Sequence, residues 1–456
     1  MTGKLFGTTG VRKVYGDEFD LQMALNLGKA LGTYLKQGTI LLARDARTTG
    51  LMIADAFAAG VMSTGVHVVR AGIIPTPTLA LMTREYKYEA GVMVTASHNP
   101  PEYTGLKFWS SDSMGFDPKT EAELESIYES KKFKKAAWDA LGTQRSIDTA
   151  VQDHIRALLE SCDAELIRSK KFRVIVDPGN GTASVLTPYL MQELGCEVVS
   201  INAQLDGYFP GRKSEPEEES LGDLIRMIEE TGADLGIAHD GDSDRGVFVT
   251  EQGEVIRGDR TIAVLAQVEM STVKKPVLVT TVDSSMALDE VVEDAGGKTV
   301  RTPVGDIRVA MKIKEEKAVF GGEASGVFIF PDFHLAPDPF LAGCRLLEMM
   351  AREGKSFGEL VDKVPRYPLK KTKIKCANSE KEAAMDRLQE TLPKGFKDIR
   401  EVIDVDGIGL VLKEGWVLVR PSGTEPVIRI TCEGPTEDAV TRVLRETEEI
   451  VRKAVS

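Results

Sequence analysis

A pattern of apolar strand, short turn, amphipathic helix and second apolar strand occurs three times in this chain of 456 residues. The three units begin with apolar runs at residues 40–43, 172–176 and 277–280. A helix that joins two strands in this way places them parallel in one sheet. Because the units start more than 100 residues apart, they indicate three related α/β domains with parallel or mixed sheets rather than a short-period solenoid.

The C-terminal part of the chain has a different pattern. It contains short strands followed by Pro435 and an amphipathic helix, whose apolar side chains are Val440, Val443, Leu444 and Val451. A hairpin turn at Gly253 and a proline-bounded stretch at residues 365–370 separate further units. The pattern predicts four domains, the last a smaller α+β domain, at residues 1–148, 149–253, 254–366 and 367–456.

Asp20 is expected to cap the first helix of the chain, because aspartate side chains accept hydrogen bonds from the free backbone N–H groups of a helix start. The helical spacing places one apolar face at Leu21, Leu25, Gly28, Leu31 and Leu35. This spacing is typical of a helix that buries one face.

Composition disfavours several classes of partner. The net charge is −13, and a surface this acidic disfavours nucleic acid or an anionic membrane. No apolar run approaches the roughly 18 residues that a membrane span needs, and the N-terminal residues hold no apolar signal core. The five cysteines are scattered without a CxxC pair, which is typical of reduced thiols. We therefore expect a cytoplasmic protein that acts on a small molecule.

The stretch TASHNP at residues 95–100 is the first candidate site. It follows an apolar run, and ligand chemistry in α/β folds gathers beyond the carboxyl ends of strands. The prolines at positions 100 and 101 prevent an immediate helix, so Ser97 is expected on a loop that a substrate can reach. His98 is suited to donate to a phosphate or transfer a proton, and Lys107 supplies positive charge. Taken alone, the hexapeptide is more typical of a turn.

The stretch DGDSDR at residues 240–245 favours a functional site over a simple turn at residues 95–100. Asp240, Asp242 and Asp244 recur at a spacing of two, which in an extended loop points three carboxylates the same way. Such hard oxygens suit Mg²⁺ or Ca²⁺. An EF-hand loop is the rival interpretation, but Arg245 stands where that loop needs glycine, and the flanks are typical of strands. A solvated acidic turn explains the strict alternation poorly.

Two glycine-rich stretches have residues suited to phosphate or sugar. GTTGVR at residues 7–12 offers backbone N–H groups and ends in Arg12, which can bind phosphate through two hydrogen bonds. GGEASG at residues 321–326 contains Glu323 and Ser325, which can accept and donate hydrogen bonds to adjacent sugar hydroxyls. Each stretch by itself is more typical of an ordinary loop or turn.

A fifth stretch, RPSGTEP at residues 420–426, follows an apolar strand at residues 416–419. An arginine, two hydroxyls and a glycine-opened backbone make a suitable phosphate cradle, formed here by Arg420, Ser422, Gly423 and Thr424. Arg429 on the next predicted strand is placed to assist.

Four of these motifs together resemble the α-D-phosphohexomutase superfamily, which includes phosphoglucosamine mutases and phosphomannomutase/phosphoglucomutases. The motifs at residues 95–100, 240–245, 321–326 and 420–426 occur in the family's order and span essentially the whole chain. The resemblance implies three α/β domains and a smaller α+β domain around a central cleft, in agreement with the strand and helix pattern.

The resemblance also implies roles for the catalytic residues. Ser97 would carry a phosphoryl group, and one Mg²⁺ would be bound by a phosphoserine oxygen with Asp240, Asp242 and Asp244. Arg12 would line the site near the phosphoserine. Many relatives have a histidine where this chain has Val327, so proton transfer would fall to Lys107, His98, Arg12 or water.

Substrate recognition is assigned by the same resemblance. Glu323 and Ser325 would contact the 3- and 4-hydroxyls of the sugar, and Arg245 would contribute to substrate binding. The phosphate that does not react would be bound by Arg420, Ser422, Gly423, Thr424 and Arg429. Relatives often have Asp-Gly shortly after the Glu-x-Ser-Gly loop, where this chain has Asp338-Pro339.

The expected activity is a phosphoryl shift between C6 and C1 of a hexose, through a phosphoserine enzyme and a bisphosphate intermediate, with hexose bisphosphate as activator. The opening residues 4–10 and the Glu-Ala-Ser loop resemble phosphoglucosamine mutases, so glucosamine 6-phosphate is the expected substrate and phosphomannomutase/phosphoglucomutase activity the alternative. A Mg²⁺-dependent sugar phosphatase would use the same aspartates, and a non-catalytic phosphosugar sensor ranks last because both catalytic sets are present. The sequence carries no signal of oligomeric state.

Overall fold

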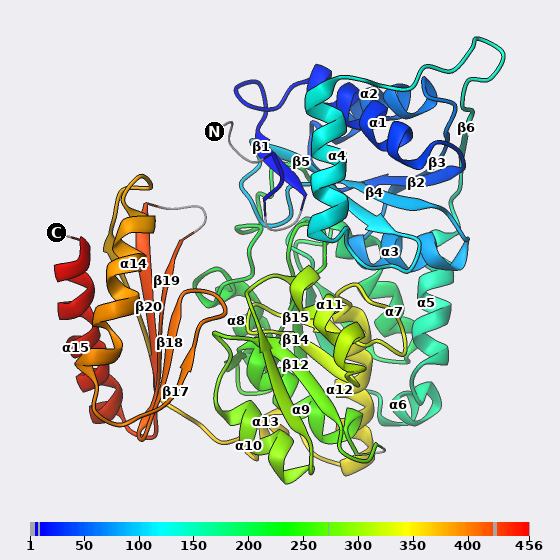
Figure 1. Ribbon diagram of the computed structural model, residues 1–456. Helices are drawn as coiled ribbons and strands as arrows, with labels where there is room; N and C mark the ends of the chain where they lie inside the picture. Colours follow the sequence, from blue (N-terminus) through cyan, green and yellow to red (C-terminus); the bar gives the residue numbers. More distant parts are fainter. Residues whose placement is uncertain (1–4, 8–9, 272, 423–425, 456) are drawn as a thin grey trace.

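The computed structural model describes residues 5–7, 10–271, 273–422 and 426–455, which form four sheets, each packed with helices (Figure 1). The first sheet has the strand order β1-β5-β4-β2-β3-β6. Its strands are β1 (Val11–Val14), β2 (Thr39–Arg44), β3 (His67–Ile73), β4 (Ala90–Val94), β5 (Tyr103–Ser110) and β6 (Gln144–Ser146). The helices on it are α1 (Leu21–Leu35), α2 (Gly50–Met62), α3 (Thr76–Glu85) and α4 (Pro118–Ser130).

The second sheet has the order β11-β10-β9-β7-β8. Its strands are β7 (Arg173–Asp177), β8 (Glu197–Ser200), β9 (Leu235–His239), β10 (Gly246–Thr250) and β11 (Val255–Ile256). The associated α-helices are α5 (Ala150–Glu160), α6 (Ala164–Lys170), α7 (Thr187–Glu193) and α8 (Gly222–Thr231), with 3₁₀ turns η1 (Thr182–Val185) and η2 (Glu218–Ser220).

The third sheet has the order β13-β12-β14-β15. Its strands are β12 (Val277–Thr281), β13 (Lys298–Thr302), β14 (Phe320–Glu323) and β15 (Val327–Ile329). The helices are α9 (Gly258–Glu269), α10 (Ala287–Asp294), α11 (Asp306–Glu316), α12 (Pro339–Glu353) and α13 (Phe357–Val361).

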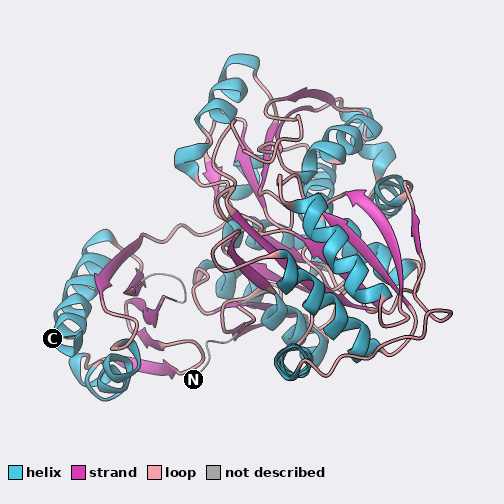
Figure 2. Ribbon diagram, turned by 90° about the horizontal axis from the view of Figure 1, so that it is seen from above, coloured by secondary structure: helices cyan, strands magenta, loops and turns pink. Residues whose placement is uncertain are grey.

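The fourth sheet is antiparallel throughout and has the order β16-β20-β19-β18-β17. Its strands are β16 (Leu369–Lys375), β17 (Ile399–Ile403), β18 (Ile408–Leu412), β19 (Gly415–Pro421) and β20 (Val427–Glu433). Helices α14 (Lys381–Thr391) and α15 (Glu437–Val455) cover the face turned away from the rest of the molecule, as Figures 1 and 2 show, and η3 (Pro393–Gly395) follows α14.

The three repeated units predicted from the sequence are confirmed. In each, the two strands pair in parallel: β2 with β3, β7 with β8, and β12 with β13. The first three sheets also contain antiparallel pairs, such as β4 with β5 and β9 with β10, so they are mixed as expected. The α/β class with a smaller C-terminal α+β domain therefore describes the molecule.

Hydrophobic packing joins the second and third sheets into one unit. A single core contains Val174 and Leu235 from the second sheet, Leu278 and Phe320 from the third, and Leu346 from α12 between them. The first and fourth sheets have cores of their own. A further apolar cluster joins the other face of the first sheet, including Leu41 and Trp109, to Ala150 of α5 and to Ala336, so apolar and polar contacts together form the junction with the central unit.

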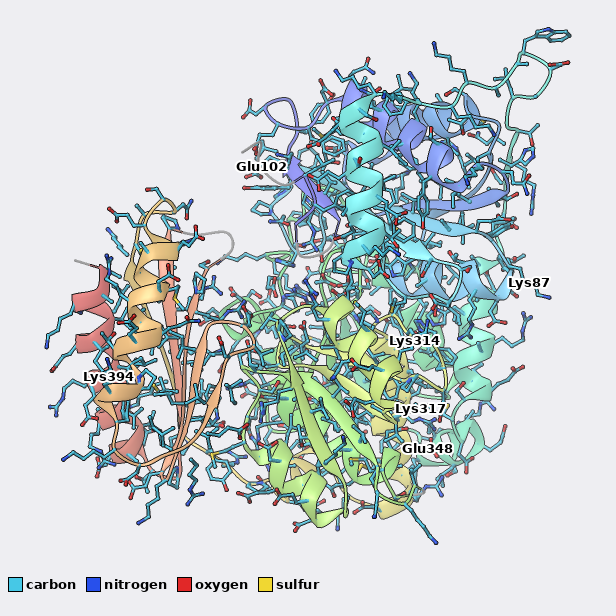
Figure 3. The ribbon with its side chains drawn as sticks, in the orientation of Figure 1. Lys87, Glu102, Lys314, Lys317, Glu348 and Lys394 are labelled. Carbon is cyan, nitrogen blue, oxygen red and sulfur yellow. The ribbon has the colours of Figure 1, made fainter. Side chains whose placement is uncertain are left out.

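One polar contact is the ion pair at 2.7 Å between Lys314 of α11 and Asp112, which follows β5. Figure 3 labels Lys314. Both side chains are largely exposed to solvent, and exposed ion pairs of this kind contribute little to stability.

The predicted face of α1 was partly wrong. Asp20 does cap the helix, accepting a hydrogen bond from the N–H of Met23 at 2.7 Å. Leu21, however, is 41% exposed, and the buried side chains of α1 include Ala24, Leu27 and Leu31. The reason is that α1 packs closely on α2 through small residues, so large apolar side chains do not mark the contact face.

Two glycines make this close approach possible. A Cβ at Gly28 of α1 would lie 2.2 Å from the carbonyl oxygen of Phe57, and a Cβ at Gly60 of α2 would lie 2.2 Å from that of Leu25. Both distances are far below van der Waals contact.

No helix among the described residues is long and apolar enough to cross a membrane.

We expect Gly28→Ala to destabilise the first domain by about 1–3 kcal/mol, because the added methyl group forces α1 away from α2. Gly222→Ala in α8 is the matched control, since a Cβ there meets nothing within 4 Å and alanine favours a helix. Thermal unfolding followed by circular dichroism compares the two variants. Equal melting temperatures would show that the glycine contact is unimportant.

Candidate active site

Ser97 lies in a short loop that follows β4 and is buried, with 1% of its surface exposed. Its backbone has φ of 52°, in the left-handed region that residues other than glycine rarely adopt. The N–H of Ser97 donates to Thr95 Oγ1 at 2.8 Å, and its hydroxyl donates to Asp240 Oδ2 at 3.0 Å. The loop of the first sheet thus presents its serine directly to a carboxylate of the second.

Arg47, which is 1% exposed, holds this loop in place. Its guanidinium donates to four backbone carbonyl groups of the loop, those of Ser97 (2.8 Å), Asn99 (2.6 Å), Pro100 (2.6 Å) and Tyr103 (3.1 Å). Asp45 accepts one hydrogen bond from Arg47 Nε at 3.1 Å and another from Thr95 Oγ1 at 2.6 Å. The sequence indicated only a turn at residues 44–47, because a local pattern does not show which distant loop an arginine contacts.

The three aspartates lie in the tight connection between β9 and β10, an antiparallel pair in which Gly246 faces His239. Asp240, Asp242 and Asp244 are all buried. Gly241 between them allows a close contact, since a Cβ there would lie 2.8 Å from the carbonyl oxygen of Ser97. The predicted strands on both sides of this loop are therefore confirmed, and the EF-hand alternative is excluded by the fold.

The aspartate loop has the features of a cation site. One oxygen from each of the three carboxylates lies within 4.8 Å of the others. Asp242 Oδ1 is buried and has no hydrogen-bond partner within the described residues. Clustered carboxylate oxygens are the ligands that hard divalent cations prefer. These residues therefore fit a divalent cation such as Mg²⁺.

Lys107 of β5 joins the first sheet to this loop. Its ammonium group is 1% exposed and forms ion pairs with Asp242 Oδ2 at 2.7 Å and with Asp244 Oδ2. Thr76 at the start of α3 donates to the same Asp242 oxygen at 2.7 Å, and its N–H donates to the Asp242 carbonyl at 2.9 Å. The sequence suggested positive charge at Lys107 but gave no sign of Thr76.

Burial and mutual repulsion act strongly on the carboxylates. Burial raises the pKa of Asp240 and of Asp244, and the neighbouring carboxylates raise both further. Burial also acts on Asp242, but Lys107 overcomes it and holds the pKa of that carboxyl below its usual range. Although burial opposes the charged form of Lys107, Asp242 and Asp244 raise its pKa above the ordinary value. The cluster therefore holds excess negative charge that a bound cation would relieve.

His98 contributes a neutral imidazole. Burial lowers its pKa to about 2, and the nearby cations Arg245, Arg12 and Lys107 add to the decrease. Its Nδ1 lies 3.4 Å from a carboxylate oxygen of Glu215, without hydrogen-bond geometry, and Glu215 also forms an ion pair with Arg245 at 2.5 Å. An imidazolium at His98 is therefore disfavoured, and Glu215 is a site residue that the sequence did not indicate.

Arg12 was expected in a loop, but it lies in strand β1, opposite Gly105 of β5. Pairing with β5 extends the backbone at Arg12. Its charge lowers the pKa of His98, so its guanidinium lies near the Ser97 loop. The expected role of Arg12 beside Ser97 stays a prediction.

Glu323 was expected in a loop, but it is the last residue of β14 and is 5% exposed. It accepts hydrogen bonds from the N–H of Gly305 at 2.6 Å and from Ser325 Oγ at 3.1 Å. Burial, with a contribution from Asp306, raises its pKa to about 7. Val327 is buried in β15 directly opposite, so no titratable side chain occupies that position.

The fourth sheet presents Arg420 and Arg429 side by side, since they pair across β19 and β20. Arg420 forms an ion pair with Asp406 at 3.1 Å, and its Nε is buried without a hydrogen-bond partner among the residues described. Ser422 is 6% exposed and its carbonyl accepts a hydrogen bond from Lys381 Nζ at 2.5 Å, a lysine that the sequence did not indicate. Gly423 and Thr424 lie outside the described residues. Adjacent cations at a strand end are suited to bind an anion.

Four consecutive parts of the chain match the family models of phosphoglucomutase/phosphomannomutase domains. Residues 3–135 match alpha/beta/alpha domain I, residues 152–253 match domain II, residues 257–367 match domain III and residues 372–450 match the C-terminal domain. Together the matches cover most of the chain and include most strands of each of the four sheets.

Whole proteins match over the same length. A "Probable phosphoglucosamine mutase" of Methanopyrus kandleri is 41% identical over 453 residues, covering 99% of both chains. A "Phosphoglucomutase/phosphomannomutase" of Thermococcus kodakarensis is 39% identical over 458 residues, again covering 99% of both. The crystal structure of a phosphoglucomutase/phosphomannomutase family protein from Burkholderia thailandensis superposes with a TM-score of 0.86 at 26% identity, covering 98% of this chain and 97% of that one.

We expect Arg47→Met to release the Ser97 loop and to cost about 3–5 kcal/mol, because it leaves the buried Asp45 carboxylate and four carbonyl groups without their donor. Hydrogen–deuterium exchange should become faster at residues 97–103. Arg301→Met is the matched control, since Arg301 of β13 is mostly buried, pairs with Asp289 at 2.8 Å and donates to three backbone carbonyl groups of the third domain, those of Thr281, Ser284 and Ser285.

The control variant should lose stability without faster exchange at residues 97–103. If both variants changed exchange in that segment to the same extent, Arg47 would have no specific role in holding the Ser97 loop.

Proposed function

Because the chain belongs to the phosphoglucomutase/phosphomannomutase family and is a phosphohexose mutase, an intramolecular phosphotransferase, we propose that it moves a phosphoryl group between C6 and C1 of a hexose through phosphorylated Ser97 and a bisphosphate intermediate. The observation that carries this proposal is the hydrogen bond from the Ser97 hydroxyl to Asp240 at 3.0 Å, within a buried cluster of carboxylates and cations. A hydroxyl used only for structure has no need of such surroundings.

In each transfer, the bond between Ser97 Oγ and phosphorus breaks and a sugar hydroxyl oxygen forms the new bond to phosphorus. The proton of that hydroxyl ends on the serine oxygen. After the bisphosphate has turned over in the site, its other phosphate returns to Ser97 by the reverse step. A hexose bisphosphate added from outside would therefore phosphorylate an unmodified serine, which explains its proposed role as activator.

We assign the proton relay to Lys107. His98 is a weak base, because burial lowers its pKa to about 2, and it therefore does not hold the additional proton that a general acid must give. Lys107 is buried beside the carboxylates and is charged, so it can give a proton to the departing serine oxygen and regain one from the sugar hydroxyl.

Asp240, Asp242 and Asp244 would hold one Mg²⁺, with a phosphoserine oxygen completing the set. When bound, this cation supplies positive charge next to the phosphoryl group, which is the main form of assistance in phosphoryl transfer. The chain itself supplies Lys107 and Arg245 from the same cluster, so positioning and charge come from fixed groups.

Recognition of the sugar is proposed for Glu323 and Ser325, which share a hydrogen bond and lie at the end of β14. The nonreacting phosphate would be bound by Arg420, Ser422 and Arg429 at the ends of β19 and β20, with Gly423 and Thr424 from the same motif. Because these residues belong to different sheets, one phosphosugar would contact several domains at once.

Glucosamine 6-phosphate is the proposed substrate, supported by the name of the relative that is 41% identical. A phosphoglucomutase/phosphomannomutase relative at 39% identity keeps the mannose and glucose phosphates as the alternative. Val327 and its neighbours in β15 are buried in a strand and do not decide between these sugars.

The first experiment is ³¹P NMR of the purified protein with Mg²⁺ and a trace of hexose bisphosphate. Glucosamine 6-phosphate, mannose 6-phosphate and glucose 6-phosphate are offered separately, and we expect a new 1-phosphate resonance with the glucosamine ester. Ser97→Ala should lose at least about a thousandfold in turnover, because the group that accepts the phosphoryl is removed. Ser113→Ala, which removes another buried serine hydroxyl, should remain active.

Other outcomes lead to other conclusions. Conversion of the mannose and glucose esters alone would move the protein to that branch of the family. Steady release of inorganic phosphate would show a phosphatase, and a Ser97→Ala protein with near-normal mutase activity would rule out the phosphoserine.

Glu323 predicts a specific pH dependence. Its pKa is raised to about 7, so the carboxylate gains a proton as the pH falls through that value and then no longer accepts hydrogen bonds from two sugar hydroxyls. The KM for the hexose phosphate should therefore rise from about pH 8 to about pH 6. Glu323→Gln should have a higher KM at the upper pH and a flatter profile.

Steady-state kinetics across this range tests the assignment. The substrate phosphate titrates near pH 6 and affects both proteins equally, so the difference between the two profiles is the quantity to compare. If the KM of the wild type and of Glu323→Gln changed with pH in the same way, Glu323 would have no role in sugar recognition.

A further inference from the structure

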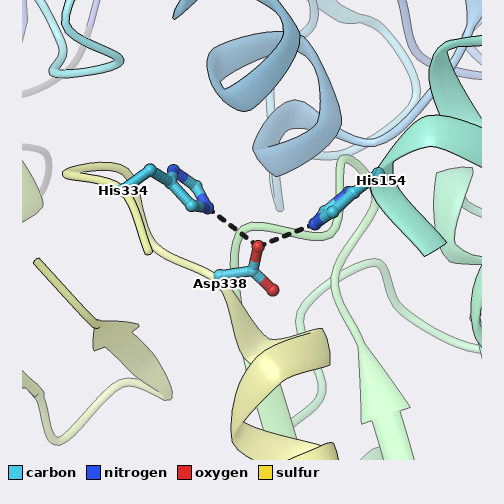
Figure 4. A group of neighbouring side chains, drawn as sticks. All are labelled: His154, His334 and Asp338. Carbon is cyan, nitrogen blue, oxygen red and sulfur yellow. Dashed lines mark hydrogen bonds and ion pairs between the residues drawn. The ribbon is translucent and has the colours of Figure 1, made fainter. Parts of the chain in front are cut away.

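A second polar cluster lies behind the aspartate loop. Asp338, the N-cap of α12, accepts hydrogen bonds on Oδ2 from His154 Nε2 at 3.0 Å and from His334 Nε2 at 2.8 Å (Figure 4). His154 belongs to α5, whereas His334 and Asp338 precede α12. All three side chains are buried. We refer to His154, His334 and Asp338 as the His–Asp–His cluster.

Every polar atom of the cluster has a partner among the described residues. His154 Nδ1 is 2.8 Å from Thr78 Oγ1, His334 Nδ1 accepts from the N–H of Ala336 at 3.3 Å, and Asp338 Oδ1 accepts from the N–H of Leu341 at 2.9 Å. His334 accepts through Nδ1 and donates through Nε2, so it is a neutral imidazole in this pattern, and His154 donates through Nε2 to the same carboxylate oxygen. The cluster is complete as a hydrogen-bonded unit and needs no metal ion.

Helix α3 connects the cluster to the middle of the aspartate loop. Thr78 meets His154, and Thr76, two residues earlier, contacts Asp242 through both its hydroxyl and its N–H. These two threonines lie in the first turn of one helix, so a shift of Thr78 also moves Thr76. Asp242 is therefore linked to His154 through a single rigid turn.

The first residues of α12 contact both ends of the same loop. The ring of Phe340 lies 5.0 Å from that of His239, the residue before Asp240. Pro339 packs on Gly246, the residue after the loop, where a Cβ would lie 2.5 Å from the proline Cβ. Phe340 also packs edge-on against the His154 ring at 5.7 Å. The beginning, middle and end of the loop are thus all supported from the cluster.

We propose that the His–Asp–His cluster is a positioning device that sets the geometry of Asp240, Asp242 and Asp244 for their cation, acting on Asp242 through Thr78 and α3. The proposal rests on the cation role assigned to the aspartates above. No hydrogen bond or ion pair among the described residues joins the three cluster residues directly to Ser97 or to the three aspartates. Their contribution is the placement of the loop, which a hydrogen-bonded carboxylate at a helix start fixes more firmly than apolar packing does.

Thr78→Val tests the link, because it removes only the hydroxyl that meets His154 and keeps the shape of the side chain. Thr78→Ser restores the hydroxyl. Thr83→Val is the matched control on the same helix, since the buried Thr83 hydroxyl bonds, within the described part of the chain, only to the Leu79 carbonyl of its own helix, at 2.7 Å. Thr78→Ala provides a smaller replacement if valine hinders folding.

The measurement is Mn²⁺ binding to the full chain by electron paramagnetic resonance, with Mg²⁺ as competitor and without sugar. We expect Thr78→Val and Thr78→Ala to bind Mn²⁺ about three- to tenfold more weakly, and Thr78→Ser and Thr83→Val to bind like the wild type. In turnover assays, kcat should fall in Thr78→Val and Thr78→Ala, while their KM for the sugar phosphate stays unchanged. Melting temperatures separate these effects from a general loss of stability.

Three results would overturn the proposal. One is equal Mn²⁺ affinity in Thr78→Val and Thr83→Val, and another is a wild-type protein that does not bind Mn²⁺ at the aspartates. The third is a tightly bound metal, found by elemental analysis, that is lost in His334→Ala, which would make the cluster a metal site. A wild-type protein that binds Mn²⁺ but has no mutase activity would refute the proposed function. The Mn²⁺ affinities of the Thr78 and Thr83 variants would still test the positioning role of the cluster.

Discussion

Three carboxylates buried side by side in one loop are the constraint on which this structure depends. Each repels the others, and a buried charge without compensation is strongly destabilising. The compensation comes partly from another sheet, since Lys107 of β5 reaches Asp242 at 2.7 Å and also contacts Asp244. The aspartate loop is therefore stable in this form only when the first sheet lies against the second, and the same contact brings Ser97 to Asp240.

The Ser97 loop is also stabilised by a buried cation, in this case Arg47. Its left-handed backbone at Ser97 is unfavourable by itself, and Arg47 maintains it with hydrogen bonds to four carbonyl groups. An arginine suits this task because its planar guanidinium offers several donors in fixed directions. Strain in the Ser97 loop and repulsion in the aspartate loop are both balanced by buried cations of the first sheet, so the interactions that stabilise the fold also shape the proposed site.

Much of this could be read from the sequence, and the failures have physical causes. The repeated strand–helix–strand pattern predicted the three parallel strand pairs, and residue type predicted the helix cap at Asp20. Both signals are carried by residues that lie close together in the sequence. The face of α1 was misjudged, since helix contact through Gly28 depends on what faces it rather than on apolar size. Thr76, Glu215 and Lys381 were missed for a similar reason: their partners are distant in the chain.

The sequence by itself determined the class of fold, the four motifs and the chemical types that a phosphosugar site requires. Spacing and residue type carry that information locally. Only the tertiary structure decided which charges meet, that His98 is neutral, that Glu323 has a pKa of about 7, and that His154 and Asp338 support the aspartate loop from behind. Burial and the distance between charges set these properties, and both arise only when sheets far apart in the chain pack together.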